Sequence, residues 1–175
     1  MIALLFNGRP ISINRVAAKV PVIFECWYLG QEGGRAVAEV LFGQTNPGGK
    51  LPISIPRSAG HLPVYYNHKP SARRGYLWDE VTPLFPFGFG LSYTTFKLEN
   101  VRLASKRIKP DGATRVLVEV TNTGRRAGSE VVQMYVRDCV SSVTRPVKEL
   151  KGFCKVWLAP GETKRVRKTI TLASQ

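Results

Sequence analysis

The chain has 175 residues, of which 43% are hydrophobic and 22% charged, and it carries a formal net charge of +14. This composition excludes a disordered or low-complexity chain, and the length suits one domain or two small ones. The N-terminal apolar run, residues 2–6, is too short for a membrane span and lacks the flanks of a signal peptide, so we expect neither.

The first 45 residues alternate strand signals with helix signals. Residues 2–6 and 20–28 are rich in apolar residues, which predicts two strands that are buried on both faces. Residues 12–20 have the apolar spacing of a helix that Ser12 caps, and residues 29–43 contain an apolar stripe followed by a glycine. This order predicts part of a parallel α/β sheet with right-handed crossovers, and we expect more of that sheet to precede the chain.

Residues 57–96 predict a linker or loop rather than a regular element. Prolines interrupt this segment repeatedly, so its backbone must be held by side chains that pack on its neighbours. Its later aromatic residues favour packing between two domains, and a platform for a sugar ring is the alternative. These residues are Phe85, Phe87, Phe89 and Tyr93.

From residue 97 the apolar period becomes two, as in strands with one buried face. Five alternating segments, separated by turn residues, predict an antiparallel β-sandwich of immunoglobulin or fibronectin type III shape. They span residues 96–105, 114–124, 129–138, 149–161 and 163–172. In the fourth segment we expect Leu150 and Phe153 to be packed. Such sandwiches normally have seven strands, so we expect this one to be incomplete.

The positive charge concentrates in residues 97–175, where 17 basic residues face 7 acidic ones. A basic domain can bind nucleic acid or another anionic polymer. Solvated polar faces of strands explain the same charge, and we favour this interpretation because no nucleic-acid-binding motif accompanies it.

The sequence contains no recognisable pattern of residues that bind a metal or a cofactor. The three cysteines are an odd number without a paired spacing, which predicts free, mostly buried thiols. His61 and His68 lack the spacing and the partners of a metal site. The glycines of residues 30–34 match no phosphate-binding motif, so we expect no nucleotide and no other cofactor. Glu32 lies in that turn. Its carboxylate suits either a ligand site at the edge of the sheet or stabilisation by the helix dipole.

Three long segments of the sequence resemble glycoside hydrolase family 3. They read "WYLGQEGGRAVAEVLFGQTNPGGKLPISIPRSAGHLPVYYNHKP", "PLFPFGFGLSYTTF" and "VEVTNTGRRAGSEVVQMYVRDCVSSVTRPVKELKGFCKVWLAPGETK". The similarity is greatest to bacterial β-glucosidases and β-xylosidases that end in a fibronectin type III-like domain. It implies an α+β chain of two parts: the end of an α/β sandwich domain at 1–56, a linker at 57–96, and a fibronectin type III-like β-sandwich at 97–175. Both ends of the chain are expected to be incomplete.

The resemblance implies a retaining, exo-acting β-glycosidase that acts on oligosaccharides or aryl β-glycosides. Retaining hydrolysis requires two carboxyl groups about 5 Å apart, and in this family both lie upstream of the matching segment. We therefore expect no catalytic residue here and no activity without the missing N-terminal barrel domain. No nucleic-acid or membrane partner is expected.

The loop after residue 61 contains the candidate substrate-binding residues on the aglycone side. Aromatic rings and hydrogen-bond donors together suit the two sides of a sugar ring. The candidates are Tyr66, His68, Arg73, Arg74 and Tyr76. Alternatively, Arg73 and Arg74 pair with carboxylates of the missing domain. Two further functions for the whole chain stay open, a stand-alone carbohydrate-binding or structural module and a basic domain that binds nucleic acid.

Overall fold

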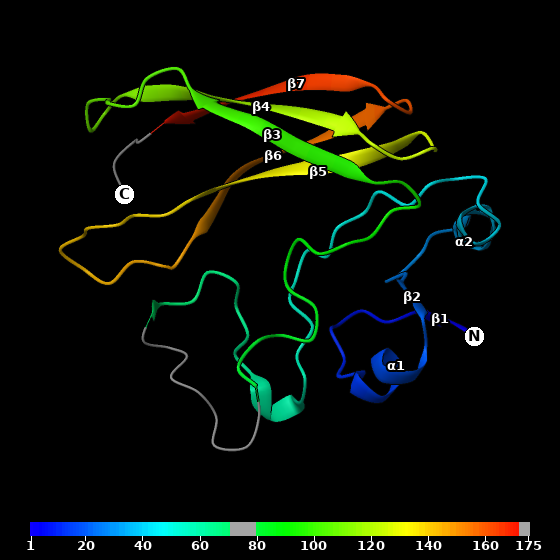
Figure 1. The fold of residues 1–175 in the computed structure, drawn as a ribbon. Coiled ribbons are helices and arrows are strands. Elements are labelled where there is room, and N and C mark those ends of the chain that lie inside the picture. The colour runs from blue at the N-terminus through cyan, green and yellow to red at the C-terminus, as the bar shows by residue number, and fades with distance from the viewer. Residues whose placement is uncertain (71–79, 172–175) are drawn as a thin grey trace. The chain divides into compact units, whose positions relative to one another are not determined.

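The computed structural model describes residues 1–70 and 80–171 (Figure 1). The chain divides into two compact units. The first comprises Met1–Thr45, Lys50–Gly90 and Arg137–Glu149, and the second comprises Asn46–Gly49, Leu91–Val136 and Leu150–Gln175. We call them the α/β unit and the sandwich unit. The domain boundaries expected after residues 56 and 96 stay a prediction.

The α/β unit begins with the predicted order of strand, helix, strand and helix. These elements are β1 (Ile2–Leu5), α1 (Asn14–Lys19), β2 (Val22–Glu25) and α2 (Gly33–Leu41). Strands β1 and β2 pair in parallel, with Ile2 opposite Val22 and Leu5 opposite Glu25. The parallel arrangement predicted for this part of the chain is therefore confirmed.

Two local expectations for this unit were wrong. Ser12 does not cap α1, whose N-cap is Ile13 without a side-chain hydrogen bond. Ile13 is buried to 8% exposure, so we attribute the start of the helix to the packing of this apolar side chain. The strands are also not buried on both faces, since Ile2 is 50% and Val22 38% exposed. A two-stranded sheet with short helices offers too little surface to cover them.

The rest of the α/β unit is mostly irregular, as the prolines predicted. It contains a short 3₁₀-helix, η1 (Ala59–His61), and a cis peptide bond between Leu62 and Pro63. Residues 51–55 lie beside residues 84–89, where Ile55 and Phe85 form an isolated antiparallel bridge. The amide of Leu51 donates to the carbonyl of Phe89 at 2.8 Å. The two ends of this long loop are therefore joined by backbone hydrogen bonds.

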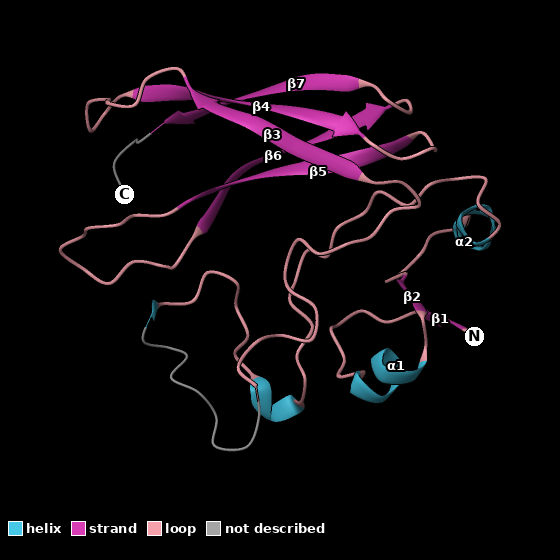
Figure 2. Ribbon diagram, viewed as in Figure 1, coloured by secondary structure: helices cyan, strands magenta, loops and turns pink. Residues whose placement is uncertain are grey.

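The sandwich unit contains all five predicted strands (Figure 2). They are β3 (Phe96–Leu103), β4 (Ala113–Asn122), β5 (Gly128–Val136), β6 (Glu149–Leu158) and β7 (Thr163–Thr171). One sheet has the order β3-β4-β7 with antiparallel pairing, and the other consists of β5 and β6. The predicted class, a parallel α/β segment followed by an antiparallel fibronectin-like sandwich, is confirmed.

The core of the sandwich unit draws on both of its sheets. Val118 and Val120 of β4, Val132 of β5, Leu158 of β6 and Val166 of β7 form one buried cluster. Alternate residues of β4 point into it because successive side chains of a strand face opposite sides. Val120 and Leu158 are fully buried. Burial of this cluster stabilises the unit through the hydrophobic effect.

One buried polar residue ties the end of β4 to the neighbouring turns. Asn122 has no exposed surface. Its Oδ1 accepts from Thr94 Oγ1 at 2.7 Å and from the amide of Gly124 at 3.1 Å. Its Nδ2 donates to the carbonyls of Arg126 at 2.7 Å and Leu158 at 3.1 Å. With its polar atoms satisfied, the amide fixes the strand end at little desolvation cost.

The three cysteines are free, as predicted, but they are not mostly buried: Cys26 and Cys154 are half-buried, and Cys139 is exposed. Cys139 follows the end of β5 in an irregular segment, where a core position is not available. Among the helices described here, none has the length and apolar character needed to cross a bilayer.

Candidate functional site

The carboxyl edge of the β1–β2 pair is one candidate site, because parallel sheets place ligands at this edge. Glu25 is the last residue of β2, and its Oε1 accepts from the amide of Trp27 at 3.3 Å. The side chain of Asn7, just after β1, also hydrogen-bonds Glu25. Trp27 has a φ of 53°, in the left-handed region that a bulky residue rarely adopts. Strain of this kind concentrates at functional sites.

The electrostatics of this edge centre on Glu25. Burial raises the pKa of Glu25 above its ordinary value of 4.5, and the hydrogen bonds from Trp27 and Asn7 offset part of that rise. Burial also raises the pKa of the Cys26 thiol, and the charge of Glu25 adds to the increase. Asn7 Oδ1 is buried and has no hydrogen-bond partner in the described part of the chain. The edge thus has one strained backbone position, one desolvated carboxyl group and one unsatisfied acceptor.

Glu32, which the sequence singled out, has a different environment. It is the N-cap of α2, it is exposed, and its side chain makes no capping hydrogen bond. The turn before it closes through a hydrogen bond from the Gly33 amide to the Gly30 carbonyl at 2.9 Å. A Cβ on Gly33 would lie 2.4 Å from Leu29 Cβ, which explains a glycine here. An exposed carboxylate at a helix N-terminus suits the helix dipole.

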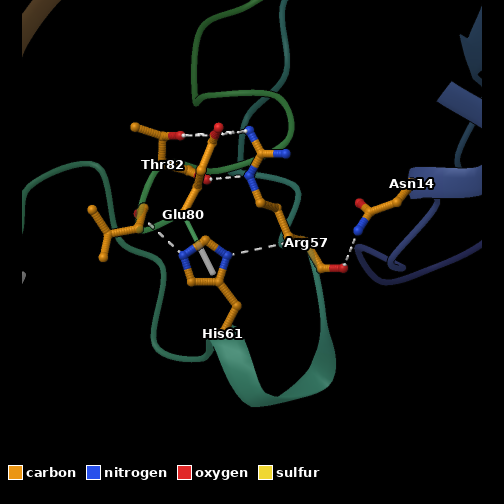
Figure 3. A network of polar contacts seen from close by, with 6 residues as sticks. Asn14, Arg57, His61, Glu80 and Thr82 are labelled. Carbon is orange, nitrogen blue, oxygen red and sulfur yellow. Dashed lines mark hydrogen bonds and ion pairs between the residues drawn. The ribbon is translucent and has the colours of Figure 1, made fainter. Parts of the chain in front are cut away.

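A network of polar contacts holds the loop that contains the predicted sugar-binding residues (Figure 3). Arg57 donates through Nε to the carbonyl of Thr82 at 2.8 Å and through Nη2 to Glu80 Oε2 at 2.7 Å. The side chain of Asn14, in α1, donates to the carbonyl of Arg57 at 2.8 Å. Arg57 therefore links three segments of the α/β unit that are far apart in the sequence.

His61 belongs to the same network, and both of its ring nitrogens are engaged. Nδ1 accepts from the amide of Arg57 at 3.2 Å, and Nε2 lies 3.1 Å from the carbonyl of Val81. Because a carbonyl only accepts, the ring carries its proton on Nε2. His61 acts as a brace between the two sides of the loop. In the described ranges, no group of three or more acidic, histidine or cysteine side chains is arranged to hold a metal.

Tyr66 and His68 are the two predicted site residues that the structure describes. The Tyr66 ring stacks on Phe87 with a centroid distance of 4.2 Å and an interplanar angle of 16°, so one of its faces is covered. His68 Nδ1 donates to the carbonyl of Lys69 at 3.0 Å, and the His68 carbonyl accepts from the amide of Val147 at 3.0 Å. Arg73, Arg74 and Tyr76 lie outside the described residues, so the grouping of the five stays a prediction.

The aromatic residues of the linker make contacts within their own units. Phe85 and Phe89 stack with a centroid distance of 5.4 Å. The guanidinium carbon of Arg126 lies 6.0 Å from the centroid of the Tyr93 ring, a cation–π arrangement. Their expected role in packing two domains together stays a prediction.

Sequence reasoning missed two residues that shape these regions. The first is Glu25, whose pKa burial raises. Its position at the end of an apolar strand was the feature of the sequence that could have indicated it. Asn46 is the other. Its Oδ1 accepts from Ser92 Oγ and from the amide of Tyr93, both at 2.8 Å, and its Nδ2 donates to the carbonyl of Ala127 at 2.9 Å. A lone asparagine in a glycine-proline turn gives no sign of such distant partners.

The parallel β–α units and the fibronectin-like sandwich together define an α+β chain of the kind expected at the C-terminal end of a multidomain glycosidase. Residues 1–93 match the model of the glycosyl hydrolase family 3 C-terminal domain, and residues 130–174 match that of the fibronectin type III-like domain. The chain belongs to glycosyl hydrolase family 3.

Individual relatives cover nearly the whole chain. A "Beta-xylosidase" of Formosa agariphila is 54% identical over 170 residues, which are 95% of this chain and 24% of that protein. A "Periplasmic beta-glucosidase" of Salmonella typhimurium is 49% identical over 95% of this chain and 23% of its own length. This chain therefore spans about a quarter of the length of the relatives that it matches.

Solved structures give the same result. A β-glucosidase from Erythrobacter marinus superposes with a TM-score of 0.95 and 46% identity, covering 98% of this chain and 23% of that one. The β-glucosidase of Listeria innocua in complex with glucose has a TM-score of 0.93 and 39% identity, over 98% of this chain and 25% of that one.

Proposed function

We propose that this chain forms the C-terminal part of a retaining, exo-acting β-glycosidase that removes terminal sugars from oligosaccharides or aryl β-glycosides. A β-glucosidase is the first choice and a β-xylosidase the second. The observation that supports this most strongly is the identity of 49% and 54% to two such enzymes across both units of the chain.

The catalytic carboxyl pair of this enzyme lies outside the 175 residues. Glu25 is engaged by Asn7 and by the Trp27 amide, so its carboxyl group holds the turn after β2. Glu32 is exposed at a helix N-terminus. Neither environment provides the opposed acid and nucleophile that retaining hydrolysis requires. The chain is therefore inactive by itself.

The α/β unit contributes the carboxyl edge of its sheet and the loop after residue 61. The loop closes the aglycone side of the pocket, with Tyr66, His68, Arg73, Arg74 and Tyr76 in contact with the substrate. The Arg57 network supports this assignment, because it joins the two ends of the loop through hydrogen bonds to Thr82, Glu80 and His61. The sandwich unit acts as a rigid support rather than as a catalytic surface.

Exposed apolar surface on the α/β unit supports a role inside a larger enzyme. Tyr28 is 84% exposed and Phe42 82% exposed, and both flank the helix α2. Large apolar side chains at such exposure favour burial against another part of a protein. The unsatisfied Asn7 Oδ1 also suits a donor from outside this chain.

A chimera tests the proposal. The aligned quarter of the Salmonella typhimurium enzyme is replaced by this chain, and hydrolysis of aryl β-glucosides and β-xylosides is measured. We expect the chimera to hydrolyse the β-glucoside, whereas the same enzyme with that quarter deleted releases no sugar. A soluble, folded chimera that hydrolyses neither substrate would contradict the proposal.

The loop assignment has its own test in that chimera. Changing Arg73→Gln together with Arg74→Gln should raise KM for aryl β-glycosides several-fold and leave kcat nearly unchanged, because uniform binding is lost. Arg125→Gln in the sandwich unit is the matched control. If both sets of variants have the wild-type KM, the two arginines do not contact the substrate.

A further inference from the structure

A hollow of about 220 Å³ lies on the face of the β3-β4-β7 sheet that points away from the core. Three arginines line it, one from each strand: Arg102 of β3, Arg115 of β4 and Arg167 of β7. Leu117 of β4 also lines the hollow. Because Val118 and Val120 point into the core, Leu117 and Arg115 lie on the outer face of the same strand.

The strand register brings the three arginines together. Arg102 and Arg167 both lie opposite Leu117, one on each side of it. Neighbouring strands are about 4.8 Å apart, so the two Cα atoms are separated by roughly 10 Å, within reach of two arginine side chains. Arg115 is two residues from Leu117 along β4, on the same face. The three side chains therefore surround one leucine.

A β-bulge is responsible for the place of Arg102. Glu99 pairs with Glu119 and Arg102 with Leu117, so β3 has one residue more than β4 between these pairs. Without that extra residue Val101, rather than Arg102, would lie beside Leu117. Asn100 supports the bulge, with a φ of 55° and a hydrogen bond from Nδ2 to Glu119 Oε2 at 2.6 Å. Bulges commonly direct a side chain toward a site.

The carboxylates of this face already have other partners. Glu119 accepts from Arg165 Nε at 2.8 Å as well as from Asn100, and Glu99 pairs with Lys97 Nζ at 2.7 Å. In the part of the chain that is described, no hydrogen bond or ion pair engages the guanidinium groups of Arg115 and Arg167. Only Arg102 among the three is close enough to Glu119 for its charge to lower the pKa of that carboxyl group. The hollow thus collects positive charge that the carboxylates of this face offset only in part.

The surrounding sequence increases this charge. Residues 102–115 contain five basic residues and one acidic residue, Asp111. Exposed like charges close together destabilise a fold slightly. Such an arrangement is expected where an anion binds.

The lining of the hollow defines the class of anion. Guanidinium groups form paired hydrogen bonds with carboxylate, sulfate or phosphate oxygens. The wall is mostly aliphatic, with Leu117 between the arginine stems, and it suits the apolar face of a sugar ring. No aromatic side chain of the described residues lines the hollow, so a nucleic-acid base has no platform to stack on. The volume is below that of a pocket for a drug-sized ligand, and it suits a single ring.

We propose that this hollow binds an anionic pyranoside, a sugar ring that carries a carboxylate or a sulfate group. The charged group lies between Arg102, Arg115 and Arg167, and the ring packs on Leu117. The site belongs to the sandwich unit, to which the proposed function gives only a supporting role, and it does not depend on the proposed glycosidase activity. It would hold the protein on an acidic polysaccharide.

Binding to the full 175-residue chain tests the proposal by titration calorimetry. The probes are methyl β-glucuronide for the carboxylate, glucose 6-sulfate for the sulfate, methyl β-glucoside as the neutral sugar and inorganic sulfate as the free anion. We expect at least one charged sugar to bind about tenfold more tightly than the neutral one, equivalent to about 1.4 kcal/mol. The affinity should fall as salt is added, because exposed charges are screened.

Two double variants with the same change in net charge identify the site. Arg115→Gln with Arg167→Gln should weaken binding of the charged sugar about tenfold or more. Arg125→Gln with Lys155→Gln, at exposed positions elsewhere in the sandwich unit, should leave it unchanged. Leu117→Thr should weaken binding of the charged sugar and leave that of inorganic sulfate as it was. Circular dichroism and thermal unfolding check that each variant is folded. If the double variant Arg115→Gln with Arg167→Gln does not fold, Arg167→Gln alone takes its place.

Three results would overturn the proposal. The first is a neutral sugar that binds as tightly as the charged ones, and the second is equal weakening of binding by the two double variants. The third is a folded chain that binds no charged sugar at millimolar concentration. Binding of single-stranded DNA in preference to the charged sugars would also contradict it and would favour a site for nucleic acid.

Discussion

In the sandwich unit, five buried residues from four strands form one continuous cluster. In the α/β unit, the buried apolar residues Ile13, Ile55 and Val64 belong to no such cluster within the described ranges. Polar contacts, chiefly those of Arg57 and His61, hold its long loop instead. The two units of this chain therefore depend on different forces for their stability.

Burial of apolar surface involves no titrating group and acts over a whole cluster, whereas exposed polar contacts contribute little each and break locally. We therefore expect the sandwich unit to unfold as a whole and the α/β unit to open in parts. This division suits the proposed function, in which the sandwich supports and the loop meets the substrate.

The largest expected effect is that of a cavity in the sandwich core. Leu158→Ala removes a fully buried side chain and should cost about 2–5 kcal/mol in the free energy of unfolding. Ile55→Ala in the α/β unit, at 3% exposure, should cost less because its surroundings can collapse. Denaturant unfolding of both variants measures the two costs, and equal costs would show that both units depend on apolar packing to the same degree.

Asn122→Asp tests the polar anchor of the sandwich. The new carboxylate keeps the bonds from Thr94 and Gly124, but it faces the carbonyls of Leu158 and Arg126 without a donor. Unsatisfied buried groups cost about 1–3 kcal/mol each, so we expect a loss of that order in the free energy of unfolding. Asn67→Asp, at an exposed position, is the control and should have almost no effect. A neutral result for Asn122→Asp would show that the anchor is dispensable.

Arg57→Gln should loosen the α/β unit without affecting the sandwich. The variant loses the ion pair with Glu80, whose side chain is 70% exposed, and the bond to the Thr82 carbonyl. We expect faster hydrogen exchange at amides of residues 55–62 and 81–85, with exchange in β4 and β7 unchanged. Faster exchange in both units would mean that the loop and the core unfold together.

The smallest effects are two pH dependences of opposite sign. Burial raises the pKa of Glu25 in the folded state above 4.5, so its contribution to stability is present below that value and is lost as the pH rises through the folded pKa. Hydrogen bonds from Asn100 and then Arg165 lower the pKa of Glu119, so its contribution is present above 4.5 and is lost as the pH falls through the folded pKa.

Thermal unfolding as a function of pH compares these two groups. Glu25→Gln should remove a decrease in stability at pH values just above 4.5, and Glu119→Gln should remove a decrease below 4.5. The same pH dependence in both variants and in the wild-type chain would show that neither carboxyl group is coupled to folding.

The hydrophobic period alone was sufficient to predict both parts of the fold. Alternation in β4 and β7 reflects the one face that each strand buries, whereas the apolar runs of β1 and β2 predicted the parallel pair but not the exposure of Ile2 and Val22. Which face of β6 is buried was harder to predict, because both of its faces contain apolar residues. Cys154, Val156 and Leu158 pack against the core or belong to it, whereas Phe153 is 64% and Trp157 56% exposed. The expected packing of Phe153 was wrong for this reason.

The site was less accessible from the sequence than the fold. Glu32 attracted notice through the glycines beside it, but the carboxyl group of this unit whose pKa burial raises is that of Glu25. Its partners Asn7 and Trp27 surround it only after β1 and β2 pair. The arginine hollow depends on a one-residue bulge that alternation does not reveal. Contacts set by register and bulges require the folded chain.

The most direct test of the central claim is a measurement of sugar release from an aryl β-glucoside by the 175-residue chain alone. We expect no release above that of buffer, in the wild-type chain and in Glu25→Gln and Glu32→Gln alike, because the proposed function places the catalytic carboxyl pair outside this chain. Sugar release that disappears when either glutamate is changed would contradict the claim.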